Sequence, residues 1–78
     1  MTRADKVRAI VKEVSGKSSL PGDDASLFDA QVLDSFALAD LVAAIEGRFP
    51  VKVPDSDLRP RVFESVEKID AYLAKRGV

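Results

Sequence analysis

Residues 33–48, LDSFALADLVAAIEGR, decide the fold of this 78-residue chain because they form one helical pattern. Apolar side chains recur at intervals of three and four residues, at Leu38, Leu41, Val42, Ile45 and Phe49. This spacing places them on one face of a helix, and the many alanines favour a helical backbone. Phe49-Pro50 ends the pattern, because a proline disfavours helical geometry in the residue before it. The segment predicts a helix over about 35–48 that begins at Asp34 or Ser35.

A second helical pattern precedes this segment. Apolar residues stand at positions i, i+3, i+4 and i+7, namely Val7, Ile10, Val11 and Val14. They predict an amphipathic helix over about 3–15. Thr2 and Asp5 resemble a capping arrangement at its start, and Gly16 offers a left-handed stop at its end. Residues 17–33 read as a loop that is long enough to need apolar anchors of its own, with a turn of helix at 26–30.

The C-terminal part adds a short helix and a third main helix. Start signals at 54–58 and the Arg59-Pro60 stop predict a short helix over 55–59. Ser65 serves as the N-cap of a helix over 65–76, and Glu67 suits its positive first turn. We therefore predict an all-α fold, a small four-helix bundle of three main helices and one short helix, in a single domain over residues 1–78. The expected core includes Phe28, Val42, Ile45, Phe49, Val53, Leu58, Phe63, Val66, Ile69, Tyr72 and Leu73.

The composition restricts the chemistry that this chain can perform alone. It contains neither cysteine nor histidine. A disulfide, a thiolate nucleophile, a conventional zinc site and a histidine general base are therefore excluded, and we expect no enzyme and no metal site. The longest apolar run, residues 41–45, falls far short of the ~20 residues of a membrane span. With no export signal visible, we expect a cytoplasmic protein.

Charge is distributed unevenly along the chain. Twelve Lys and Arg against thirteen Asp and Glu give a net charge of −1, which offers no general attraction to nucleic acid. Residues 23–46, however, carry no base and six acids: Asp23, Asp24, Asp29, Asp34, Asp40 and Glu46. This stretch is either a negative surface that attracts basic partners or an ordinary solvated face.

Ser35 is the residue with a candidate chemical role. It follows a long loop and opens the central helix, where backbone N–H groups and the helix dipole favour an attached phosphate. It has no neighbouring base to make it a nucleophile in a reaction of its own, but an enzyme with its own base and metal could modify it. An Asp-Ser pair before an apolar pattern is also an ordinary helix N-cap. The local pattern leaves both interpretations open.

Several motifs resemble the acyl carrier protein family over roughly residues 5–76. They are LFD at 27–29, LDSF at 33–36, LVAAIE at 41–46 with Phe49, VPD at 53–55, and FESV at 63–66 with Ile69. In that family a motif of the LDSF kind carries 4′-phosphopantetheine, donated by coenzyme A, on its serine. The arm holds acyl or aminoacyl groups as thioesters. The resemblance therefore implies a carrier whose reactive thiol belongs to its cofactor.

The resemblance also implies roles for individual residues. Ser35 would be the attachment point of 4′-phosphopantetheine. Asp34 would help a phosphopantetheinyl transferase to place its magnesium ion during modification. An acyl- or aminoacyl-loading ligase and downstream acyl-processing enzymes would bind the exposed side of the central helix, where Phe36, Asp40 and Glu46 are the expected contacts.

The chain departs from the family pattern around the motif. Val32 stands where many carriers have glycine, and Phe36 replaces the usual leucine. Ala37, Gly47 and Arg48 stand where fatty-acid carriers usually have acids. These departures argue against a general fatty-acid role. The LDSF motif and the ending LRPRVFESV at 58–66 are more similar to D-alanyl carrier proteins and to free-standing carriers of dedicated polyketide, peptide or aminoacyl pathways. A shuttle that presents one helix to several partners is expected to be a monomer. The alternative is a helical protein-interaction module that keeps the carrier fold and is never modified.

Overall fold

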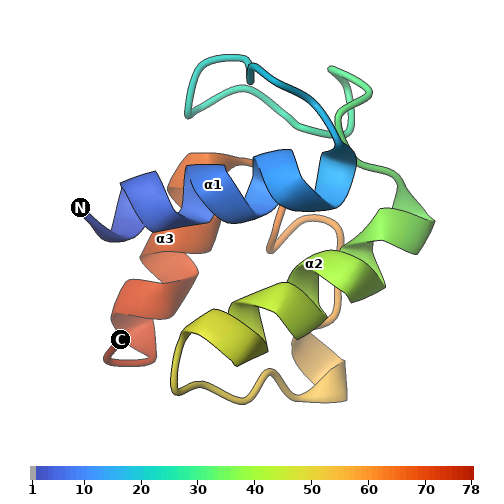
Figure 1. Cartoon of the computed structure of the whole chain (residues 1–78). Coiled ribbons are helices and arrows are strands. Elements are labelled where there is room, and N and C mark those ends of the chain that lie inside the picture. Colours follow the sequence, from blue (N-terminus) through green and yellow to red (C-terminus); the bar gives the residue numbers. More distant parts are fainter. Residues whose placement is uncertain (1) are drawn as a thin grey trace.

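The computed structural model describes residues 2–78, which form three α-helices and one turn of 3-10 helix. These elements are α1 (Arg3–Ser15), α2 (Ser35–Arg48), η1 (Asp55–Asp57) and α3 (Val66–Lys75). Figure 1 shows α1 lying across α3, which is on the left of the view, while α2 runs below α1 on the right. Helix α1 contacts both α2 and α3. No strand occurs in residues 2–78. The predicted all-α class and its three main helices are confirmed.

The ends of the helices follow from the residues that cap them. The Thr2 side chain accepts a hydrogen bond from the Asp5 N–H while the Asp5 carboxylate accepts one from the Thr2 N–H, which completes the expected capping box. Gly16 ends α1 with a φ of 74°, a left-handed value that favours glycine. The Ser65 side chain accepts from the Lys68 N–H. Ser65 is therefore the N-cap outside α3, and this helix is one residue shorter at each end than the predicted 65–76.

The predicted short helix at 55–59 is present but shorter than expected. It is a 3-10 turn of three residues, in which the Leu58 N–H donates to the Asp55 carbonyl at 3.1 Å. Pro60 disfavours helical geometry at Arg59, and Leu58 already leaves the helical region with a ψ of 69°. Residues 2–78 therefore contain a 3-10 turn where the sequence predicted a short helix, and the expected four-helix bundle is not confirmed.

The core is built from the apolar stripes of all three α-helices and from the segment between α2 and α3. Val7, Ile10, Leu41, Ile45, Phe63, Ile69 and Leu73 are at most 1% exposed. The Phe63 ring packs at a tilt against the Tyr72 ring, with centroids 5.4 Å apart, while Phe28 and Tyr72 remain half-buried. Leu58 is 39% exposed, so its place in the expected core is wrong. None of the helices in residues 2–78 combines the length and the apolarity that crossing a bilayer requires.

Two buried leucines, Leu27 and Leu33, anchor the long segment between α1 and α2. It rises above α1 in Figure 1 and then descends to the start of α2. Leu27 is fully buried, and its N–H donates to the Glu64 carbonyl at 2.7 Å. The Leu27 carbonyl accepts from the N–H groups of Val32 and Leu33. Because this turn is fixed, the next residue, Asp34, enters α2 at a defined position. The expected turn at 26–30 is confirmed by the Ala30 N–H bond to the Ser26 carbonyl.

Candidate functional site

Asp34 and Ser35 have different roles at the start of α2: Asp34 caps the helix, and Ser35 is its exposed first residue. Asp34 is the N-cap, with an extended backbone, and its Oδ1 accepts a hydrogen bond from the Ala37 N–H at 2.8 Å. Ser35 is the first helical residue and is exposed. The interpretation of Ser35 as the cap is therefore wrong, because the preceding carboxylate fills that role. The Ser35 hydroxyl is left available at the surface.

The electrostatics of this helix end favour an anion. The first N–H groups of a helix have no intrahelical partner and form the positive end of its dipole. The first turn of α2 contains no acidic side chain. The negative charge next to this turn is that of its N-cap, Asp34. A phosphate on Ser35 would gain from the free N–H groups, while the Asp34 carboxylate would repel it.

Of the three expected partner contacts, two are freely exposed and one has a structural role. Phe36 is 87% exposed, an unusual position for a phenyl ring, and Asp40 is exposed one turn farther along α2. Glu46 is half-buried, and its Oε2 accepts a hydrogen bond from the Val53 N–H at 2.8 Å. Glu46 therefore ties the end of α2 to the segment that follows it.

The acidic stretch 23–46 does not form a single surface. The carboxylate of Asp23 pairs with Arg8 of α1, with 2.8 Å between Oδ1 and Nε. This hydrogen bond holds the pKa of Asp23 below its ordinary value, and the neighbouring positive charge adds to the effect. Asp24, Asp29 and Asp40 remain exposed. In residues 2–78, no group of three or more acidic side chains converges in the manner of a metal site.

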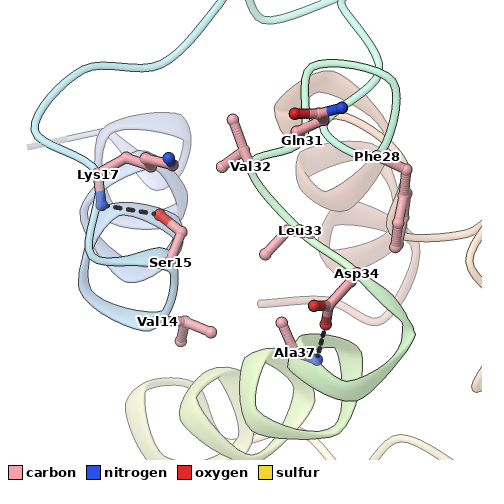
Figure 2. Close-up of a pocket in the computed structure, with 9 residues that line it drawn as sticks. All are labelled: Val14, Ser15, Lys17, Phe28, Gln31, Val32, Leu33, Asp34 and Ala37. Atoms are coloured by element: carbon pink, nitrogen blue, oxygen red, sulfur yellow. Dashed lines mark hydrogen bonds between the residues drawn. The ribbon is translucent and has the colours of Figure 1, made fainter.

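A hollow of about 560 Å³ borders the same end of α2, and no sequence pattern predicted it. We call it the α1–loop hollow, because it lies between the C-terminal end of α1 and the loop that leads to α2 (Figure 2). Its lining residues are Val14, Ser15, Lys17, Phe28, Gln31, Val32, Leu33, Asp34 and Ala37. Of these residues, Asp34 alone was a candidate site residue. Lys17 and Gln31 belong to no motif, and only the path of the loop brings them close to Asp34.

Comparison with known proteins agrees with this geometry. The family described as the phosphopantetheine attachment site matches residues 5–70. The D-alanyl carrier protein of Streptococcus uberis is 41% identical over 46 residues, which make up 59% of this chain and 58% of that protein. D-alanyl carrier protein 2 of Lactiplantibacillus plantarum is 29% identical over 68 residues, or 87% of this chain and 85% of that protein. The D-alanyl carrier protein of Streptococcus sanguinis is 39% identical over 46 residues, with coverages of 59% and 58%.

The family match covers well over half of the chain. Proteins of this family bear a 4′-phosphopantetheine prosthetic group and act as carriers rather than as enzymes. The chain therefore belongs to the phosphopantetheine-binding acyl carrier protein family.

Proposed function

We propose that this protein carries acyl or aminoacyl groups as thioesters on a 4′-phosphopantetheine arm attached to Ser35. The observation that carries this proposal is the division of tasks at the start of α2. Asp34 caps the helix through Oδ1, so the exposed Ser35 hydroxyl is free to be modified. By contrast, Ser65, which opens α3, is 3% exposed and has its hydroxyl oxygen engaged by the Lys68 N–H.

The residues at this position fit the prosthetic group. In the modification, the Ser35 oxygen bonds to phosphorus, the serine proton leaves, and the nucleotide part of coenzyme A departs. The resulting phosphodiester anion lies at the positive end of α2. When bound, the arm supplies the thiol that a chain without cysteine lacks. The protein itself supplies the position of the arm and the surface that partner enzymes recognise.

Asp34 has a second role in this proposal. Its Oδ1 is engaged by the Ala37 N–H, while the side chain as a whole remains exposed. The other carboxylate oxygen is therefore accessible to the magnesium ion that a phosphopantetheinyl transferase brings. Carboxylate oxygen is a preferred ligand of magnesium, so Asp34 would help to place that ion beside Ser35.

Partner enzymes would approach the exposed side of α2. Phe36 offers an apolar contact next to Ser35, and Asp40 offers a negative charge that complements a basic patch. Glu46 would add charge from its half-buried position. The partners are the transferase, a ligase that loads the cargo and the enzymes that process it. We also propose that the protein acts in the cytoplasm as a monomer, with residues 1–78 as one carrier domain.

D-alanine is the cargo that we propose to test first. The three relatives described above are all named D-alanyl carriers, which favours an aminoacyl cargo over the polyketide and peptide pathways that were also expected. Incubation of the modified protein with D-alanine, ATP and a D-alanine-activating ligase should add one alanyl group to the arm. Ser35→Ala, which would lack the arm, serves as the matched control, and a modified wild type that gains no alanyl group beside a loaded D-alanyl carrier would contradict a D-alanyl role.

Intact-protein mass spectrometry tests the attachment. The protein is incubated with coenzyme A, magnesium and a broad-specificity phosphopantetheinyl transferase, beside the variants Ser35→Ala and Ser56→Ala. Ser56 is an exposed serine in η1 and controls for non-specific modification. We expect one phosphopantetheine mass gain in the wild type and in Ser56→Ala, and none in Ser35→Ala. A folded wild type that gains no mass beside a modified control carrier would favour the unmodified interaction module.

A further inference from the structure

We infer that the α1–loop hollow is a resting site for the phosphopantetheine arm, on the side of α2 that faces the C-terminal end of α1. This inference rests on the proposed attachment at Ser35. The hollow lies close enough for this purpose, because two of its lining residues, Asp34 and Ala37, flank Ser35 in the chain. An arm attached to Ser35 would therefore start next to the lining of the hollow.

The lining of the hollow suits an uncharged chain in which amide and apolar groups alternate. Val14, Val32 and Leu33 offer methyl groups, and Figure 2 shows Val14 and Val32 on opposite sides of the space. Gln31 carries an amide at the rim that can donate to and accept from amides of the arm. The volume of about 560 Å³ lies within the roughly 300–1,000 Å³ of small-molecule sites. A purely hydrocarbon cargo would leave the polar groups of this lining unused.

The backbone of Gln31 supports a ligand-binding role. Its φ of 60° is the only positive value of a residue other than glycine in residues 2–78. Glycine adopts this conformation without strain, whereas glutamine does so at a cost in energy. Residues with strained backbones cluster at ligand-binding sites. The Gln31 N–H donates to the Phe28 carbonyl at 3.0 Å, so the backbone of this turn is fixed beside the hollow.

Charge distinguishes this hollow from two others on the surface. One of them, of about 280 Å³, is lined by three cations, Arg61, Lys68 and Lys75. The other, of about 260 Å³, has Lys6 and Arg48 in its lining. In the α1–loop hollow, the one cation, Lys17, is balanced by Asp34. The neutral balance fits the uncharged part of the arm beyond its phosphate. The two cationic hollows suit anions and do not include residues at the start of α2.

Isotope-filtered NMR on the modified protein tests the inference directly. The protein carries ¹³C and ¹⁵N, and the arm is transferred from unlabelled coenzyme A. We expect nuclear Overhauser contacts from protons of the arm to the methyl groups of Val14, Val32 and Leu33. Contacts confined to residues of the α3 side, such as Val62, or no contacts at all, would overturn the inference. A protein that gains no arm refutes the proposed function itself, which mass spectrometry establishes beforehand.

Thiol reactivity gives a second readout through Val32→Phe, which fills the hollow, and Val62→Phe, its control. Val62 is also a half-buried valine and lines the cationic hollow beside α3. If the arm rests in the hollow for about two-thirds of the time, its release raises the reaction rate with a disulfide reagent about threefold. We expect this rise in Val32→Phe and not in Val62→Phe. Should Val32→Phe fail to fold, Gln31→Gly removes the amide without straining the backbone and should raise the rate in the same direction. Equal rates in the wild type and the folded variants would refute the resting site.

Discussion

Two substitutions of Asp34 separate its capping role from its proposed role beside magnesium. Asp34→Ala removes the acceptor of the Ala37 N–H bond, which is 2.8 Å long. Losing an N-cap costs about 1 kcal/mol of folding free energy, and such a loss lowers the melting temperature of a domain of this size by roughly 4–8 °C. Asp34→Asn keeps an oxygen for the same bond, and asparagine caps helices as well as aspartate does. We expect its stability to stay within about 0.5 kcal/mol of the wild type.

The rate at which the transferase modifies these two variants should change differently from their free energy of unfolding. Both variants lose the carboxylate that would help to place the magnesium ion, so both should gain the phosphopantetheine mass more slowly than the wild type. Urea denaturation followed by circular dichroism measures the stability, and the initial rate of mass gain measures the modification. Ser35→Ala completes the series, because Ser35 is not the cap and its loss should leave the free energy of unfolding nearly unchanged.

Two results would refute this reasoning about Asp34. If Asp34→Asn were as unstable as Asp34→Ala, the hydrogen bond to Ala37 would not be the source of the stabilisation. If Asp34→Asn were modified at the wild-type rate, its carboxylate would have no part in placing the metal. The two readouts are independent, so either role can fail without the other.

Three further substitutions test contacts that hold the site in place. Leu27→Ala empties a fully buried position that anchors the long loop. It should lower the free energy of unfolding, measured by urea denaturation, by about 2–5 kcal/mol. A loss no larger than that of Leu58→Ala, which changes an exposed leucine, would contradict the anchoring role. The folded pKa of Asp23 is lowered by Arg8, so this pair stabilises the fold above the unfolded pKa and is lost as pH falls. Unfolding free energy should therefore decline more steeply between about pH 5 and pH 3 in the wild type than in Asp23→Asn, and parallel profiles would disprove this linkage. Glu46→Ala removes the acceptor of the Val53 N–H and should lower the free energy of unfolding by about 1 kcal/mol. Glu46→Gln keeps an acceptor and should keep this stability. A change in its affinity for partner enzymes would then show that the charge of Glu46 matters.

The main helices could be predicted from the sequence because their apolar residues repeat with helical spacing. The stripe that begins at Val7 and the one that begins at Leu38 place α1 and α2 at their observed bounds. Thr2 and Gly16 mark the ends of α1 through local backbone chemistry, which depends on few neighbours. The positions of α1 and α2 could therefore be predicted without any knowledge of tertiary contacts.

Details of the site depended on tertiary structure or on a single backbone angle. Whether Asp34 or Ser35 caps α2 is decided by which residue first takes helical angles, and both residue types are good caps. Leu58 belongs to an apolar residue type, but the stop at Pro60 turns its segment outward. Lys17 and Gln31 lie 14 positions apart in sequence, and only the path of the loop places both of them beside α2.

The position of α1 between its two partners has a consequence for synthesis on the ribosome. A helix of 13 residues is marginal in water when isolated, and α1 gains its tertiary contacts from α2 and α3. The pairing of Arg3 with Asp70, at 2.7 Å, joins positions 67 residues apart. Nascent chains that lack α3 should therefore remain unfolded and poor substrates for a transferase. The cell would then modify only chains whose translation has passed α3, so that coenzyme A is not spent on incomplete carriers.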